Sequence, residues 1–373
     1  MKAWPLLGLL FIQAFLCFAH WFLYRIVLDF WWPLDPAMES GLRLALWILS
    51  FSFVAAALLG FRFCSWIVSL LYRLASIWLG FANFFFFGAC LCWIVDFVLR
   101  SALSNAARLH ARPYVAATIL AAAFLVACYG FLNARWIRLR RVPVRLPNLP
   151  PSWRGRNALL MTDLHLGNIN GTRFARRIAE RARQLAPDLI FFSGDLFDGS
   201  HCDPAHLAAP LFQLAPPLGI YFVSGNHEEF RGTRPYSEAV ARAGFKVLES
   251  EHVEVDRVHV IGVSYHDSNR PVAMRAFLMG LNLNGSAPSI LLQHVPNRLP
   301  IADEAGVSLQ LCGHTHGGQF LPFNWITHRA FGKFTYGLQR FGNLQVYTSS
   351  GAGTWGPPMR VGSRPEIVLL TFE

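Results

Sequence analysis

The chain has 373 residues, of which 54% are hydrophobic and only 15% are charged, and its formal net charge is +11. This composition is too apolar for an ordinary soluble protein, and the length has room for two or three domains. The positive charge is uneven, because residues 1–145 hold 13 Lys and Arg against 4 Asp and Glu, whereas residues 146–373 hold 20 against 18. The basic character therefore belongs to the amino-terminal part and its border, which argues against nucleic acid as a partner.

The amino-terminal part contains four long apolar segments, at residues 4–24, 44–61, about 75–99 and 114–133. At ~1.5 Å per residue the first is long enough to cross a bilayer core, and no small-residue cleavage site follows it, which favours a retained helix over a signal peptide. Residues 62–74 are ambiguous, because they could be interfacial or could lengthen a neighbouring helix. We expect four transmembrane helices that anchor the chain in a lipid bilayer, with too few buried ionisable groups for a transport pathway.

A basic cluster after the fourth apolar segment predicts the orientation. It consists of Arg135, Arg138, Arg140, Arg141 and Arg145. Arginines this close to a membrane exit are typical of the cytoplasmic side, although Arg100, Arg108 and Arg112 before the fourth segment weaken the case. We expect a multi-pass protein of the inner (cell) membrane whose carboxy-terminal domain lies on the cytoplasmic side.

The chain changes character after the apolar part. Residues 142–156 contain four prolines, which cannot continue a helix, and they predict a linker between an anchor of residues 1–141 and a second domain of residues 157–373. Short apolar runs in that domain predict strands at 157–162, 188–193, 219–224, 258–263, 289–293, 308–312, 344–348 and 366–372. A helix is expected at about 171–186, and the alternation of strand and helix indicates an α/β fold.

Five short polar motifs each follow one of the predicted strands. They are Asp163-Leu-His165, Gly194-Asp195-Leu-Phe-Asp198, Gly225-Asn226-His227-Glu228, His294 and Gly313-His314-Thr-His316. Loops at the carboxyl ends of strands converge on one edge of a sheet, so we expect these side chains to gather at a single rim. One motif alone is typical of a polar turn or of a satisfied core histidine. All five, in order and each after a strand, indicate a metal centre.

The donor atoms of these motifs are carboxylate, amide and imidazole groups. One carboxylate, such as that of Asp195, can bridge two cations about 3.5–4 Å apart. Asn226 offers a neutral amide oxygen, and His294, His314 and His316 offer neutral imidazoles. Nitrogen and oxygen donors without thiolates fit two divalent ions of manganese, iron or zinc better than magnesium alone, and we favour manganese.

The five motifs resemble those of the calcineurin-like metallophosphoesterase superfamily, over about residues 155–373. The stretches 313–319 and 351–360 are similar to a narrower, membrane-associated bacterial branch with lipid-pathway phosphoesterases. The resemblance implies a β-sandwich flanked by helices, with His227 as the general acid. The implied ligands are Asp163, His165, Asp195 and His316 for a first metal, and Asp195 as bridge with Asn226, His294 and His314 for a second. A structural hydrogen bond that holds the Asn226 loop is the alternative role for His227.

The implied reaction is metal-dependent hydrolysis of a phosphate mono- or diester or a pyrophosphate, by attack of a metal-bridging hydroxide. Arg360 is a candidate clamp for the substrate phosphate, because its planar fork matches phosphate oxygens. Tethering to a membrane favours a lipid-linked, phospholipid-like substrate. Hydrolysis of soluble or cyclic nucleotides is one alternative, and a membrane scaffold or sensor with a non-catalytic metal site is another.

Overall fold

The computed structural model describes residues 4–31, 33–283 and 285–373, so the first three residues of the predicted anchor lie outside the described part. The chain divides into two compact units. The first comprises Met1–Leu132 and Gly356–Met359, and the second comprises Asn133–Trp355 and Arg360–Glu373.

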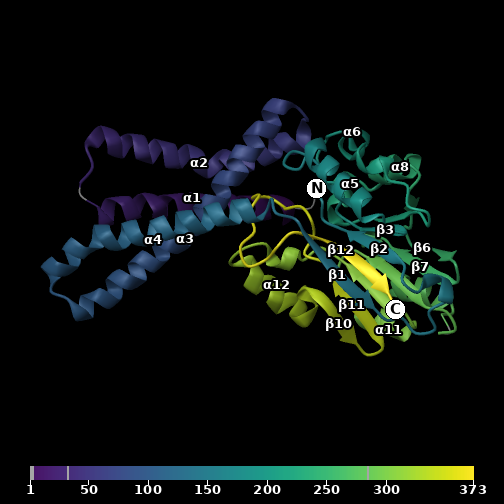
Figure 1. Cartoon of the computed structure of the whole chain (residues 1–373). Helices are drawn as coiled ribbons and strands as arrows, with labels where there is room; N and C mark the ends of the chain where they lie inside the picture. Colours follow the sequence, from purple (N-terminus) through teal and green to yellow (C-terminus); the bar gives the residue numbers. More distant parts are fainter. Residues whose placement is uncertain (1–3, 32, 284) are drawn as a thin grey trace. The chain divides into compact units, whose positions relative to one another are not determined.

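Long helices form the first unit (Figure 1). They are α1 (Trp4–Phe30), α2 (Pro36–Arg62), α3 (Trp66–Ala102) and α4 (Asn105–Asn133). In the described part of the chain these four are the helices long and apolar enough to cross a membrane, by length and composition. The predicted number is confirmed. Residues 66–74, which the sequence left open, form the beginning of α3, where the Ser65 hydroxyl accepts a hydrogen bond from the backbone N–H of Val68.

A buried ion pair joins α3 to α4 within this unit. Asp96 of α3 is buried. Arg112 of α4 donates two hydrogen bonds to its carboxylate, at 2.8 and 2.9 Å, and Arg108 donates a third at 2.9 Å. An unpaired carboxylate in these apolar surroundings would be strongly destabilising, so the pairing makes Asp96 tolerable there. Large apolar side chains such as Phe11 and Phe97 are exposed on these helices.

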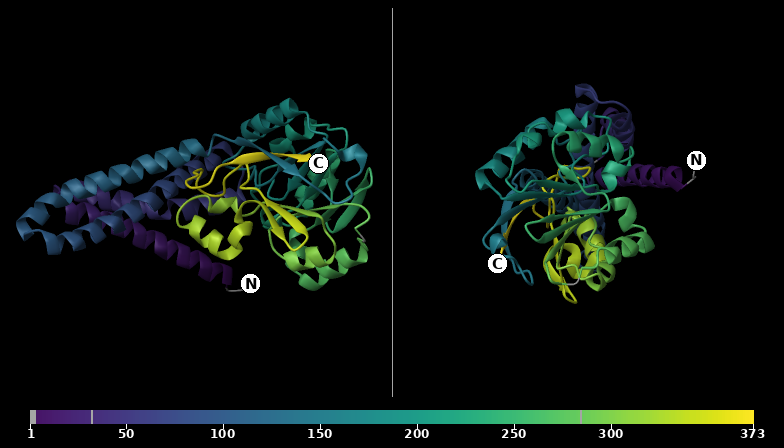
Figure 2. Two further views of the ribbon diagram at one scale, coloured as in Figure 1. Left: turned by 60° about the horizontal axis from the view of Figure 1, so that its bottom comes forward. Right: turned by 90° about the vertical axis from the view of Figure 1, so that its right-hand side faces the viewer.

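The second unit contains two mixed sheets (Figure 2). The first sheet has the order β1 (Arg138–Val144), β12 (Glu366–Phe372), β2 (Asn157–Met161), β3 (Leu189–Ser193), β4 (Ile220–Val223), β5 (Lys246–Val247). The second has the order β10 (Gly337–Phe341), β11 (Leu344–Thr348), β9 (Leu309–Cys312), β8 (Ser289–Gln293), β7 (Val258–Val263), β6 (Glu251–Val255). Strands β2 to β5 run parallel in the first sheet, as do β7, β8, β9 and β11 in the second.

The two sheets pack face to face, and helices cover their outer faces. The inner core joins Leu160 and Phe191 of the first sheet to Leu292 and Leu311 of the second. Helices α5 (Thr172–Leu185), α6 (Pro204–Ala208) and α8 (Arg234–Arg242) contribute to the core outside the first sheet. Helices α10 (Pro271–Gly280) and α11 (Leu299–Glu304) do so outside the second. The predicted α/β sandwich flanked by helices is confirmed.

Helix α5 shows how the sequence places these outer helices. Ala175, Ile178, Ala179 and Ala182 recur at spacings of three and four residues and are all buried, while most of the arginines between them are exposed. This is the pattern of an amphipathic helix with one face on the core. The structure gives α5 bounds within one residue of the predicted ones.

The predicted linker differs from what the structure shows. Strand β1 begins at Arg138 and pairs in parallel with β12, and Val144 and Trp153 lie in the inner core. Pro143 does not prevent this, because β1 is an edge strand, where a missing N–H can be tolerated. The predicted boundaries at residues 141 and 157 stay predictions, but part of the segment between them belongs to the sandwich.

We expect Trp153→Ala to destabilise the protein by about 3–5 kcal/mol, because it empties a large core volume. The indole is fully buried, its Nε1 donates to the carbonyl of Val255 at 3.1 Å, and its ring lies 5.0 Å from that of Phe372. Thermal unfolding of the full chain in detergent measures the effect, with the exposed Trp136→Ala as the matched control. Equal unfolding temperatures for the two variants would contradict a core role for this segment.

Candidate metal centre

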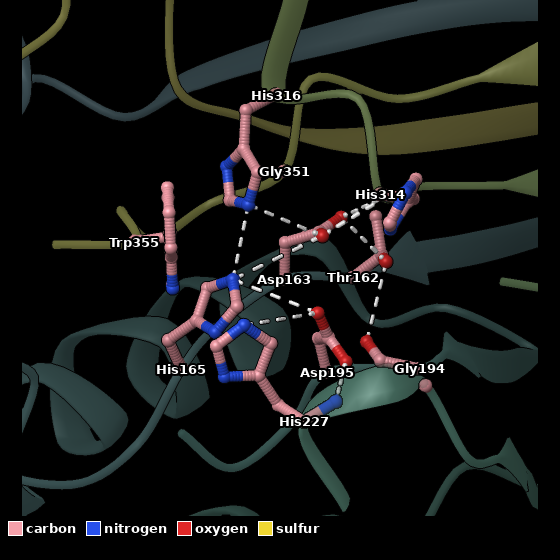
Figure 3. Close-up of polar contacts among 12 residues, drawn as sticks. Thr162, Asp163, His165, Gly194, Asp195, His227, His314, His316, Gly351 and Trp355 are labelled. Carbon is pink, nitrogen blue, oxygen red and sulfur yellow. Dashed lines mark hydrogen bonds and ion pairs between the residues drawn. The ribbon is translucent and has the colours of Figure 1, made fainter. Parts of the chain in front are cut away.

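The predicted site residues follow the carboxyl ends of five strands. Asp163 and His165 come after β2, Asp195 after β3 and Asn226 after β4, all in the first sheet. His294 comes after β8, and His314 and His316 after β9, in the second sheet. Since both sheets present these ends at the same rim, the side chains converge although more than 150 residues separate Asp163 from His316 (Figure 3).

The first group of donors consists of Asp163, His165 and His316, which are all buried. Nε2 of His316 lies 3.4 Å from Oδ1 of Asp163 and 3.0 Å from Nε2 of His165. The donor atoms of this group lie within 4.8 Å of one another. The three side chains therefore point at one common volume, which is the geometry that a cation requires.

Asp195 lies between this group and a second one. Its Oδ2 is 3.9 Å from Nε2 of His165 and 3.2 Å from Nε2 of His294. Its Oδ1 accepts a hydrogen bond from the backbone N–H of His227 at 2.9 Å. One carboxylate thus faces donors from both sheets, which is the position that a bridging ligand would occupy.

Asn226 and His314 complete the second group. Oδ1 of Asn226 lies 2.9 Å from Nδ1 of His314, and the ring of His314 lies 5.1 Å from that of His294. His294 is oriented by its other nitrogen, because Nδ1 lies 2.8 Å from the carbonyl oxygen of Ser193 and must donate to it. Its Nε2 is thereby directed at Asp195, and loss of the proton on Nε2 would free the lone pair with which an imidazole binds a metal. The structure thus brings all seven predicted ligands together.

The electrostatics of the group fit a cation. Burial opposes protonation of His294, yet the carboxylates of Asp195 and Asp163 outweigh it and raise the pKa of His294 to about 10. The negative potential that holds a proton there would equally attract a divalent ion. In addition, His294 Nε2 is buried and faces the carboxylate of Asp195 at 3.2 Å. Oxygen and nitrogen donors without thiolate match divalent ions such as Mn, Fe or Zn.

The three other donor histidines, His165, His314 and His316, are held in their neutral form. Burial lowers the pKa of His165 and that of His316 well below 6.5, and it lowers the pKa of His314 to about 4. Neighbouring groups reinforce burial, since Arg360 disfavours a second positive charge on His316. Neutral imidazole is the state that can donate a lone pair to a metal.

The loops that carry the donors are strained. Five of the donor residues adopt positive φ angles between 47° and 70°, a conformation that residues other than glycine rarely take. They are Asp163, His165, Asp195, His314 and His316. Such strain costs of order 1–3 kcal/mol per residue and persists only where the surroundings impose it. A glycine at position 225 lets the loop after β4 approach the loop after β3 closely, because a Cβ there would overlap the carboxylate of Asp195.

Glu228 imposes part of this loop geometry, a role that the sequence analysis missed. Its fully buried carboxylate accepts hydrogen bonds from the backbone N–H groups of Asp195 at 3.0 Å, Phe197 at 2.9 Å and Gly225 at 2.7 Å. Burial and the charge of Asp195 raise the pKa of Glu228 to about 8, and the N–H donors act in the opposite direction. Glu228 thereby ties the loop after β3 to the loop after β4. The position of Glu228 directly after Asn226 and His227 is the sequence feature that could have indicated this role.

Arg360 requires a correction, because the prediction of a phosphate clamp does not fit its surroundings. The side chain is fully buried. Its Nη1 donates to the carbonyl of His316 at 2.6 Å, and its Nη2 donates to the carbonyls of Ser350 at 2.8 Å and Gly353 at 2.6 Å. Burial lowers its pKa to about 10, which still leaves the guanidinium charged near neutral pH. A fork occupied by three carbonyls holds the loops around His316 and is not available to a substrate.

His227 presents Nε2 to the same donor groups. Its Nδ1 lies 3.0 Å from the carbonyl oxygen of Asp198, which can only accept, so Nδ1 carries the proton. Nε2 then lies 4.0 Å from Oδ2 of Asp195. The aromatic rings of Phe230 and Trp355 lie 4.6 and 6.4 Å from that of His227. The geometry fits either a proton donor or, together with His165 and Asp195, a further metal ligand.

Comparisons with known proteins identify the family of the chain. A family model described as calcineurin-like phosphoesterase matches residues 157–318. An uncharacterized metallophosphoesterase of Aquifex aeolicus is 32% identical over 262 residues, which cover 67% of this chain and 97% of that relative. A protein of Danio rerio called transmembrane protein with metallophosphoesterase domain is 32% identical over 295 residues, covering 74% of this chain and 66% of the relative.

Among solved structures, a dimetal phosphatase from Danio rerio is similar, with 13% identity and a TM-score of 0.38, covering 59% of this chain and all of that one. The sequence matches carry the assignment. The chain belongs to the calcineurin-like phosphoesterases, a class of metal-dependent enzymes that hydrolyse phosphoric esters. The predicted family and reaction class are confirmed. The chain spans 63% of one Campylobacter jejuni relative and 66% of the Danio rerio protein.

We expect Arg360→Lys to reduce turnover about 10–100-fold, because outer groups that orient metal ligands typically contribute this much. Lysine keeps the charge but cannot hold three carbonyls in one plane. Steady-state kinetics with a generic aryl phosphate should show a lower kcat and an unchanged KM. A raised KM with normal kcat would instead restore the phosphate-clamp role.

Proposed function

We propose that the protein hydrolyses a phosphate mono- or diester or a pyrophosphate that is carried by a lipid, with its catalytic domain anchored to a membrane. The observation that carries the reaction is the convergence of Asp163, Asp195, His294 and His316 from both sheets on one buried volume. A lipid-borne substrate is supported by the four helices of the first unit, which have the length and apolarity of membrane spans.

One divalent cation would be held by Asp163, His165, Asp195 and His316. A second would be held by Asp195, as the shared ligand, with Asn226, His294 and His314. Manganese is favoured for both. When bound, they supply charge neutralisation for the phosphoryl oxygens and lower the pKa of an attacking water. The role of the chain is to hold neutral imidazoles and a bridging carboxylate in place. Burial and the fixed loop geometry do so before substrate arrives.

His227 is proposed to deliver the proton to the leaving oxygen. In its protonated form Nδ1–H still donates to the Asp198 carbonyl, and Nε2–H faces the donor groups. The carbonyl thus fixes the direction of the ring. Phe230 and Trp355 are exposed, and their rings lie near that of His227. These rings suit an apolar leaving group better than a free phosphate.

Membrane anchoring and orientation complete the proposal. The relatives of zebrafish and cattle are called transmembrane proteins with a metallophosphoesterase domain, and we extend that description to this chain. The arginines at 135–145 favour the cytoplasmic face of the inner (cell) membrane. Because residues 146–373 carry nearly balanced charge, we propose a phosphorylated lipid and no nucleic acid as the partner.

Replacing His227 by Asn should keep both metals and slow turnover by about 10²–10⁴-fold, the usual contribution of a general acid. Metal content per chain, measured by mass spectrometry, and turnover of an aryl phosphate ester separate the possible roles. Loss of one equivalent of metal would identify His227 as a ligand. Full turnover would leave it with only the structural bond to Asp198.

The substrate class is tested by offering detergent-solubilised lipid pyrophosphates and lipid phosphates beside soluble nucleotides and cyclic nucleotides. With manganese present, we expect kcat/KM to be higher for the lipid esters, because anchoring and the aromatic rings add binding to the apolar part. A preference for soluble nucleotides would replace the lipid proposal. Failure to hydrolyse any ester, with metal bound, would leave a scaffold or sensor.

A further inference from the structure

Helix α12 (Phe323–Phe331) lies uncovered on the second unit. None of its nine described residues is buried. Its large apolar side chains are exposed, Trp325 to 68% and Ile326 to 48%, and Leu321 just before it to 49%. A helix of a globular domain normally hides such residues against the core. Here much of their surface is exposed in the described part of the chain, so α12 presents an apolar surface.

The charge around α12 is of one sign. Residues 320–340 contain no Asp or Glu. They contain the exposed basic residues Arg329, Lys333 and Arg340, beside His328. Exposed Trp, Phe and Ile combined with basic side chains are typical of helices that lie in the interface of a bilayer with anionic headgroups. A second copy of the same surface is a poor partner, because the like charges would face each other.

The helix is fastened to the loop that carries two donor histidines. Nδ2 of Asn324 donates to the carbonyl of Gly317 at 3.0 Å, and the hydroxyl of Thr315 donates to the carbonyl of Thr335 at 2.8 Å. The ring of Phe331 lies 6.1 Å from that of His314. Whatever binds α12 is therefore held close to the candidate metal centre.

We propose that α12, with Leu321 and Lys333, docks on the surface of an anionic lipid bilayer. This contact belongs to the second unit and is separate from the four apolar helices of the first. It rests on the proposed function and deepens it, because it would hold the metal-binding rim at the level of the headgroups. A phosphate carried by a lipid could then reach the rim without leaving the membrane.

Hydrogen–deuterium exchange of the full chain tests the contact. The protein is reconstituted in nanodiscs of phosphatidylcholine alone, in nanodiscs that also contain phosphatidylglycerol, and in neutral detergent. We expect amides of residues 321–333 to exchange about tenfold more slowly with the anionic lipid, because docking suppresses local opening. The exposed helix α10, which carries Val272 at 83% exposure, is the internal control and should not change. Equal exchange of α12 in all three media would overturn the proposal.

Charge variants provide a matched comparison. The double variant Arg329→Glu and Lys333→Glu should lose the protection, whereas Arg154→Glu with Arg270→Glu, two other exposed arginines, should keep it. Both should hydrolyse a soluble aryl phosphate as the parent does. Protection that persists in detergent and grows with protein concentration would indicate a second copy and overturn the lipid contact. The exchange does not depend on turnover, so an incorrect substrate assignment would leave this result unaffected.

Discussion

The structure depends on burying two carboxylates and several imidazoles at the point where two sheets end together. Such groups are costly to remove from water unless each finds a partner. Asp195 provides the central compensation, because its carboxylate faces His165 and His294 and also accepts a backbone N–H. Burial keeps the imidazoles of His165, His314 and His316 neutral, while the negative potential of the carboxylates draws positive charge to His294, so that a ready set of metal donors is a direct outcome of the burial.

Holding that set requires buried charges that do not themselves reach a substrate. Glu228 gathers three backbone N–H groups from two loops, and Arg360 gathers carbonyls from the loops around His316. Glu228 accepts hydrogen bonds from backbone N–H groups, and Arg360 donates hydrogen bonds to backbone carbonyls. Together they offset the cost of the left-handed backbone at the donor residues. The loops are thereby fixed from outside the metal-binding volume, which leaves the donor atoms free.

Each of the two units has a feature that hydrolysis of a lipid-borne ester would require. The first unit offers helices with the apolarity of membrane spans, and it neutralises its buried Asp96 internally. The second carries the phosphoesterase centre, with α12 fastened to the loop of His314 and His316. The surface of this helix is apolar and basic at once, unlike residues 146–319, which hold 15 Lys and Arg against 16 Asp and Glu. In the proposed function, anchoring and positioning at the headgroups would be tasks of two different segments, the first unit and α12.

Sequence alone determined the four apolar helices and eight of the strands, and it predicted the seven residues that the structure brings together, because each depends on local hydropathy or on residue type at a strand end. It could not find β1, whose pairing with β12 joins residues more than 200 positions apart, and its prolines resemble a linker. Nor could it assign Arg360, since a guanidinium is equally suited to phosphate and to carbonyls. Only the tertiary structure decided that question, because burial and the positions of the surrounding carbonyls are set by packing and not by the identity of the side chain.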